Sequence, residues 1–111
     1  MLKKMMVGAL LLSSMAGAQV AFAQDLTFNL INKTKGTVTY FHASPTNVDQ
    51  WEDDILGDKV LGPGQSIKIT IADGRRNCKY DMRFEFDEAD GLEDLEDTQN
   101  LCEMGSYTLH Q

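Results

Sequence analysis

Cys78 and Cys102 bracket the clearest strand pattern in the chain, and this pattern limits the fold more than any other feature. Apolar and polar residues alternate without a break from residue 78 to residue 87. A period of two indicates a strand with one buried face and one solvated face. The apolar side holds Cys78, Tyr80, Met82, Phe84 and Phe86, and the polar side holds Lys79, Asp81, Arg83, Glu85 and Asp87.

The residues after this strand predict a hairpin tied at its open end. Ala89-Asp90-Gly91 has the form of a three-residue loop with glycine in the left-handed position. Pairing centred on Asp90 places Cys78 opposite Cys102, so we expect a disulfide between them.

That register conflicts with the hydrophobic pattern of the returning strand. It puts Thr98 and Glu96 on the apolar side of the first strand and turns Leu95 and Leu101 away from it. Because a shift of one residue moves every side chain to the other face, we expect either a bulge or a strand covered in part on both faces.

The first 23 residues have the features of a secretory signal peptide. A positively charged start and an apolar run lead to Ala21-Phe22-Ala23, a small-x-small cleavage motif, and Ala16-Gly17-Ala18 is an alternative cut. Cleavage after Ala23 leaves one domain over residues 24–111. No later run has the ~18 apolar residues of a membrane span, so we expect a periplasmic or secreted protein without a membrane anchor after processing.

The processed chain is strongly acidic. Loss of Lys3 and Lys4 with the leader reduces the basic side chains from 10 to 8 against 17 acidic ones, and so changes the formal net charge from −7 to about −9. Such a surface repels nucleic acid and anionic lipid and attracts cations or basic protein surfaces. Two cysteines behind a signal peptide indicate an oxidising compartment.

The remaining strand patterns predict an all-β fold. Segments 26–31 and 37–42 flank turn residues and form an expected hairpin, isoleucines alternate over 66–71, and 107–110 is a last short strand. Six or seven strands at this spacing predict a small antiparallel β-sandwich.

One short helical turn is expected between the second and third of these strands. Ser44 has the position of an N-cap, Pro45 that of a first helical residue, and Gly57 follows the expected end. Apolar residues recur at helical spacing at Val48, Trp51 and Ile55. We expect Trp51 to cover an end of the β-core.

The order of several short motifs resembles an uncharacterised family of small exported bacterial proteins. The matching residues are Phe28 to Gly36, which hold an initial strand and an Asn-x-Thr turn, then Ser44-Pro45, the segment from Trp51 to Gly57, Cys78–Asp81 and Asn100–Cys102. The resemblance covers nearly the whole processed chain, and its Trp-x-x-Asp-x-Leu-Gly segment is the most specific part. It implies a β-sandwich, export, and structural anchoring by Trp51, Asp54, Gly57 and Asp81.

Proteins that the chain resembles are sometimes labelled argininosuccinate lyase. The enzyme of that name is a large helical oligomer, and the 88 β-patterned residues after the leader cannot supply its active site. The resemblance therefore implies no activity.

Two segments, 49–58 and 85–103, are dense in carboxylates, which are the ligands that calcium prefers. Asp49 with Asp53, and Asp54 with Asp58, have i, i+4 spacing that a helix would align. Neither segment fits an EF-hand loop. The candidate ligands for calcium or another divalent cation are Asp49, Asp53, Asp54, Asp58, Asp87, Glu88 and Asp90. The alternative is a solvated charged face, with Asp54 and Asp81 capping turns or pairing with Arg83.

The sequence contains no recognisable catalytic set. His42 and Ser44 lack a third member, and neither a phosphate-binding loop nor zinc-ligand spacing occurs. We therefore expect a non-catalytic exported module that binds or supports another protein of unknown identity, with a basic surface, through its acidic face. Divalent-cation binding is the alternative, and a small hydrolase or inhibitor with a pocket around His42 is the second alternative.

Overall fold

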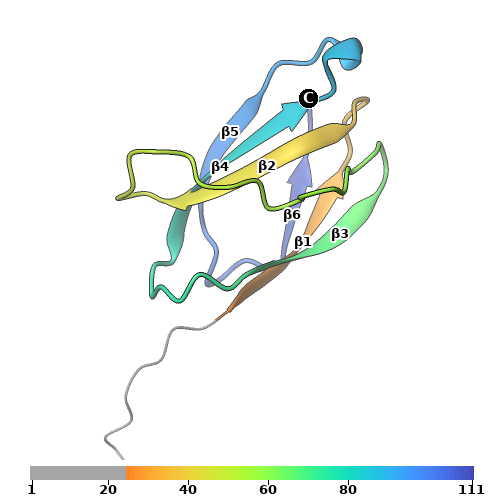
Figure 1. Cartoon of the computed structure of the whole chain (residues 1–111). Coiled ribbons are helices and arrows are strands. Elements are labelled where there is room, and N and C mark those ends of the chain that lie inside the picture. Colours follow the sequence, from red (N-terminus) through yellow and green to blue (C-terminus); the bar gives the residue numbers. More distant parts are fainter. Residues whose placement is uncertain (1–24) are drawn as a thin grey trace, which may run out of the picture.

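The computed structural model describes residues 25–111, so the expected signal peptide, residues 1–23, lies outside the described residues. The described chain is all-β, as predicted (Figure 1). Its strands are β1 (Leu26–Asn32), β2 (Val38–Pro45), β3 (Ser66–Ile71), β4 (Lys79–Phe86), β5 (Leu95–Asn100) and β6 (Ser106–Leu109). A single 3-10 turn, Glu88–Asp90, is the helical element among these residues, and none of their segments has the length and hydropathy of a membrane-spanning helix.

Two three-stranded sheets face each other, which confirms the predicted small β-sandwich (Figure 1). One sheet has the order β3-β1-β6 and the other the order β2-β4-β5. Three of the four strand pairs are antiparallel, and β6 runs parallel to β1. The central strands β1 and β4 alternate between buried and more exposed residues, as their period-two sequences require.

Aromatic rings link the two sheets through the core. Phe28 of β1 meets Phe41 of β2 edge to face, with ring centroids 6.3 Å apart. Phe41 stacks on Phe84 at 4.6 Å, and Phe84 stacks on Tyr107 of β6 at 5.8 Å. Offset and edge-on ring pairs add to the free energy of burial, so this row fixes how one sheet lies on the other.

The expected hairpin between the first two strands is wrong, because β1 and β2 belong to different sheets. The buried side chain of Asn32 directs the crossing. Its Nδ2 donates to the carbonyls of Gly36 (2.8 Å) and Leu61 (2.9 Å), and its Oδ1 accepts from the backbone N–H (2.9 Å) and the hydroxyl (2.6 Å) of Thr34. These bonds satisfy the polar groups of the turn and fasten it to the distant Leu61, so the chain leaves β1 without pairing back on it.

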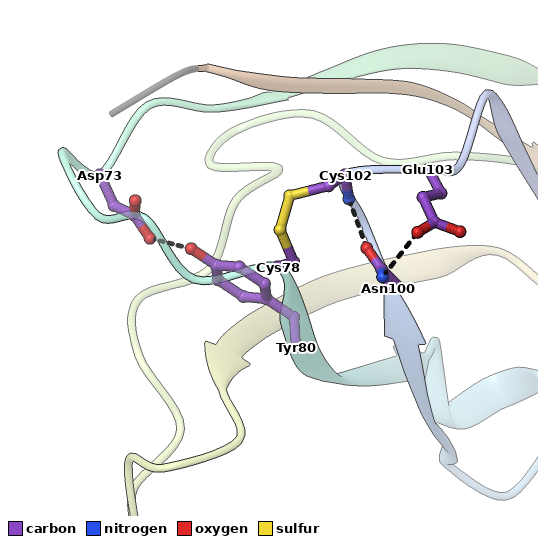
Figure 2. The surroundings of a disulfide bond; sticks show 6 residues. All are labelled: Asp73, Cys78, Tyr80, Asn100, Cys102 and Glu103. Carbon is purple, nitrogen blue, oxygen red and sulfur yellow. Dashed lines mark hydrogen bonds between the residues drawn. A yellow bond between two sulfur atoms is a disulfide. The ribbon is translucent and has the colours of Figure 1, made fainter. Parts of the chain in front are cut away.

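The predicted disulfide joins Cys78 to Cys102, whose Cα atoms lie 5.1 Å apart (Figure 2). Strands β4 and β5 pair one residue away from the expected register, with Tyr80 opposite Gln99 and Phe84 opposite Leu95. Leu95 therefore lies on the core side without the bulge or two-sided cover that we expected. Cys102 reaches Cys78 because the chain turns after Asn100, whose Oδ1 accepts a hydrogen bond from the Cys102 N–H at 3.0 Å (Figure 2).

The expected helical turn after Ser44 is also wrong. Ser44 and Pro45 continue β2 and pair with Asp81 and Tyr80 of β4, and residues 46–58 form only turns and bends. The Ser44 hydroxyl does accept a backbone N–H, but from Glu52 at 2.9 Å and not from the next turn of a helix. Pro45 is tolerated in this strand because it stands at the end of β2, an outer strand of its sheet, where a residue without an N–H can be accommodated.

Candidate functional site: a groove beside Trp51

The segment between β2 and β3 is fastened to β2 by Asp54. Asp54 Oδ1 accepts from the backbone N–H of Phe41 at 2.8 Å and of Leu56 at 3.2 Å, and Oδ2 accepts from Gly57 at 3.0 Å. The Ile55 N–H donates to the Phe41 carbonyl at 2.7 Å. Gly57 has a φ of 61°, a conformation that glycine adopts without steric cost. These contacts give the segment a fixed path over the sandwich.

Side chains from β2 hold the next part of the segment in place. The backbone of Glu52 donates to Ser44 Oγ, and its carbonyl accepts from His42 Nδ1 at 2.7 Å. His42 and Ser44, the residues that a hydrolase would need, thus both bond to the Glu52 backbone. Their arrangement positions the residues around Trp51.

A charged network fixes the far side of the same region. Arg75 donates to both carboxylate oxygens of Glu52 at 2.7 Å and lies 3.4 Å from Asp73. The Tyr80 hydroxyl donates to Asp73 at 2.5 Å (Figure 2). The hydrogen bonds from Arg75 hold the pKa of Glu52 below its ordinary value.

Burial and the neighbouring carboxylate of Asp73 shift the pKa of Tyr80 in the same direction. Both disfavour the phenolate and raise the pKa of Tyr80 above its ordinary value. For Asp73, burial acts to raise the pKa, but the bonds from Tyr80 and from the Arg75 backbone outweigh it and lower the pKa. The network is therefore ionised at Asp73, Glu52 and Arg75 and neutral at Tyr80 near pH 7.

Trp51 lies beside a hollow of about 710 Å³ between this segment and the end of β3. Its side chain is not part of the core cluster and is 39% exposed, so the expectation that Trp51 covers an end of the β-core is wrong. Apolar residues Ala43, Ile55 and Ile71 line the hollow together with Glu52, Asp53, Asp54 and Asp73. We call this hollow, with Trp51, the Trp51 groove.

Carboxylates surround Trp51 on its other sides as well. Trp51 also lines a hollow of about 150 Å³ with Asp49 and Asp81, and another of about 440 Å³ with Asp81, Glu96 and Asp97. No lysine or arginine lines any of these hollows in the described part of the chain. The groove and its surroundings therefore carry an unbalanced negative charge.

Two arginines near this region, Arg75 and Arg83, are paired with carboxylates. Arg75 is held by Glu52 and Asp73, and Arg83 donates to Glu85 at 3.2 Å and to Asp94 and Glu96 at 2.5 Å each. Asp81 does not pair with Arg83 but accepts from the Thr98 hydroxyl at 2.5 Å. Arg75 therefore already offsets part of the negative charge of Glu52 and Asp73, whereas Asp53 and Asp54 have no ion-pair partner among the described residues.

The candidate calcium ligands are spread over several turns. Asp87 Oδ1 accepts from the Ala89 N–H at 3.0 Å, and Asp90 Oδ2 accepts from the Thr37 N–H at 2.8 Å. Since residues 49–58 are not helical, the i, i+4 pairs are not aligned as expected. Within residues 25–111, no three His, Cys, Asp or Glu side chains are gathered as a metal site would need. Binding of calcium or another divalent cation stays a prediction for the whole candidate set: Asp49, Asp53, Asp54, Asp58, Asp87, Glu88 and Asp90.

Comparison with known proteins identifies no relative of this chain. No family model matches the chain, and neither a curated protein nor a solved structure matches it. The resemblance to small exported bacterial proteins therefore stays a prediction, and the chemistry of the groove rests on its own residues.

The sequence does not predict the charged network beside Trp51. The strand pattern places Tyr80 on a buried side but does not indicate its bond to Asp73 or the bond of Arg75 to Glu52. Their spacing from Glu52 along the chain carries no signal, because the contact depends on how two loops meet in space. The carboxylate density near Trp51 was visible, and it is the part of the site that the sequence indicated.

Proposed function

We propose that this protein is a non-catalytic exported module that binds a basic segment of another protein in the Trp51 groove. The observation that supports it best is an indole 39% exposed, set among carboxylates, with no lysine or arginine of the described residues lining the hollows beside it. A lysine or arginine side chain complements both features at once.

The physical basis is the attraction of a cation for an indole face. Tryptophan is the best aromatic partner for ammonium and guanidinium groups, and such a contact contributes about 0.5–2 kcal/mol, more as water is excluded. Carboxylates at the rim add charge-assisted hydrogen bonds. The apolar floor of Ala43, Ile55 and Ile71 suits the methylene stem of the same side chain.

The charge of the whole chain supports the same partner. A formal net charge of about −9 after loss of the leader attracts basic segments over distance, and this attraction weakens with salt. The expected signal peptide and the Cys78–Cys102 disulfide favour a site of action outside the cytoplasm.

Trp51 is the one tryptophan in the sequence, so its fluorescence reports on the groove directly. The test is a titration of the processed protein with a decapeptide that alternates lysine and threonine. We expect saturable change in Trp51 emission that weakens as salt is added. Peptides with serine or glutamate in place of lysine serve as controls, and an equal response to the serine peptide, or none to the lysine peptide, contradicts the proposal.

Variants separate the indole from general charge. By calorimetry, Trp51→Leu should lower affinity for the lysine peptide about tenfold, which corresponds to ~1.4 kcal/mol. Tyr40→Leu is the matched control, since Tyr40 is 50% exposed on β2 and lines none of the three hollows around Trp51. Equal affinities of the two variants would remove Trp51 from the site.

A further inference from the structure

Strand β3 is an edge strand, and the direction of its backbone groups follows from the hydrogen bonds of β1. The N–H groups of Asn29 and Lys33 donate toward the β6 side, to Gly105 at 3.1 Å and Leu109 at 2.9 Å. The N–H of Asn32 donates toward the β3 side, to Gln65 at 2.9 Å. Since backbone groups alternate in direction along a strand, even-numbered residues of β1 bond to β3.

The same alternation identifies the open edge of β3. Leu26, Phe28 and Leu30 pair with Ile71, Ile69 and Ile67, so these isoleucines use their backbone groups on β1. The N–H and C=O groups of Ser66, Lys68 and Thr70 then point away from β1. No hydrogen bond within residues 25–111 uses them outside the β1–β3 ladder.

A hollow lies at each end of this open edge. Thr70 and Ile71 line the Trp51 groove. Ser66 and Ile67 line a second hollow of about 450 Å³, together with Val60, which is 56% exposed. An extended chain on the edge would therefore find space for side chains at both ends.

We propose that the basic partner segment binds as an added strand on β3, with its main chain pairing to Ser66, Lys68 and Thr70 and a lysine or arginine side chain in the Trp51 groove. This inference rests on the proposed function and specifies the conformation of the partner. Strand addition supplies affinity through main-chain hydrogen bonds and specificity through pockets for alternate side chains.

The charges decide which occupant fits. A second copy of this chain would bring its own carboxylates toward Asp53 and Asp54, which no described cation pairs with, and like charges oppose that approach. A basic segment is complementary to them. Lys68 is exposed on the opposite side of β3 from the buried Ile69, so the partner residue opposite Lys68 should be neutral or acidic.

Amide hydrogen exchange tests the pairing residue by residue. With saturating lysine-threonine decapeptide, we expect exchange at Lys68 and Thr70 to slow roughly tenfold or more. The Ile69 amide, already directed to β1, is the internal control and should change little. Binding without protection of Lys68 and Thr70 overturns the added strand and leaves the proposed function standing, whereas absence of binding overturns both.

Proline substitution at Thr70 removes the outward donor, and because the Thr70 side chain also lines the groove, a valine variant controls for the loss of that side chain. Thr70→Pro deletes an N–H that points outward, a position where an edge strand tolerates proline, and should lower peptide affinity about tenfold. Thr70→Val keeps the N–H and loses only the side-chain hydroxyl, so it should lower the affinity much less than Thr70→Pro does. Equal binding by the two variants contradicts the proposal.

Two further measurements keep the test decisive. If Thr70→Pro does not fold, two N-methylated decapeptides replace it, one methylated at the odd-numbered amides and one at the even-numbered amides. Because alternate amides of an added strand face β3, one of these two peptides must lose binding. If light scattering detects a dimer with Lys68 and Thr70 protected before peptide is added, a second copy occupies the edge and the proposal is wrong.

Discussion

The hydroxyl of Tyr107 donates a hydrogen bond to Asp97 across 2.6 Å and so joins the outer strands of the two sheets. Tyr107 belongs to β6 and Asp97 to β5, and the Tyr107 ring also stacks on Phe84. This flank of the sandwich is closed by side chains. The other flank, between β3 and the segment fastened to β2, holds the Trp51 groove.

Removing the Tyr107 hydroxyl should weaken the closed flank. Tyr107→Phe keeps the stacked ring and loses the bond to a charged acceptor, so we expect a loss of about 1 kcal/mol in the free energy of unfolding. For a domain of this size that lowers the melting temperature by roughly 5 °C. Tyr40→Phe is the control, and equal effects of the two changes would show that the Tyr107–Asp97 bond adds nothing.

The same pair should affect the dependence of stability on pH. The hydrogen bonds from Tyr107 and Gln99 lower the pKa of Asp97, so its contribution is present above the unfolded value of about 4 and is lost as pH falls through the folded pKa. Burial and Asp97 raise the pKa of Tyr107, so that contribution is present below about 10 and is lost as pH rises further. Denaturant titrations across pH should show both losses reduced in Tyr107→Phe, and unchanged profiles would contradict this.

The disulfide should supply a large part of the net stability. Cys78 and Cys102 are 24 residues apart in sequence, and the chain-entropy model gives about 3 to 3.5 kcal/mol for such a loop. The Cys78→Ser, Cys102→Ser double variant should therefore lose about that much by denaturant unfolding. Reductant should destabilise the unchanged protein and leave the double variant unaffected.

Asn32 should be among the least replaceable polar residues. It is fully buried, and its substitution by alanine removes two donors and an acceptor from the sheet crossing. We expect Asn32→Ala to lose about 2–3 kcal/mol. Asn29→Ala is the control, because Asn29 is exposed on the same strand, and thermal unfolding compares the two. A similar melting temperature would mean that the crossing does not depend on Asn32.

Asp54 should determine the path of the segment that carries Trp51. Asp54→Ala removes the acceptors of Phe41, Leu56 and Gly57 and should cost about 2 kcal/mol while weakening binding of the lysine peptide. Asp53→Ala removes the same charge from an exposed neighbour and should leave the melting temperature almost unchanged. Calorimetry and thermal unfolding measure both, and equal destabilisation of the two variants would argue against a fastening role.

The sequence predicted the features that depend on residues close together along the chain. The alternation of apolar and polar residues in β3 and β4 predicts which side of each strand is buried. The predicted disulfide is confirmed, although the β4–β5 register differs by one residue from the expected one. The period of two cannot choose between neighbouring registers, and Asp97 and Gln99 on the core side of β5 disguised the correct one. Their position is tolerated because β5 is an outer strand and Tyr107 supplies a polar partner to Asp97.

The sequence did not predict the contacts between residues that lie far apart along the chain, and the reason is physical. The turn after Asn32 has hairpin composition, but the acceptor for its amide is the Leu61 carbonyl, 29 residues away. Ser44-Pro45 has helix-start composition, but Ser44 also has a distant partner, Glu52. In each case a contact made only in the folded chain outweighs the local preference.

The parallel pairing of β1 with β6 has a kinetic consequence. It joins the earliest strand of the described chain to the latest, and neighbouring strands along the chain, apart from β4 and β5, do not hydrogen bond to each other. Such a topology has a high contact order, which slows folding. The chain should therefore spend a long interval with most of its strands unpaired, and the β4–β5 hairpin closed by the disulfide is the one pair of consecutive described strands that can form before β1 and β6 meet.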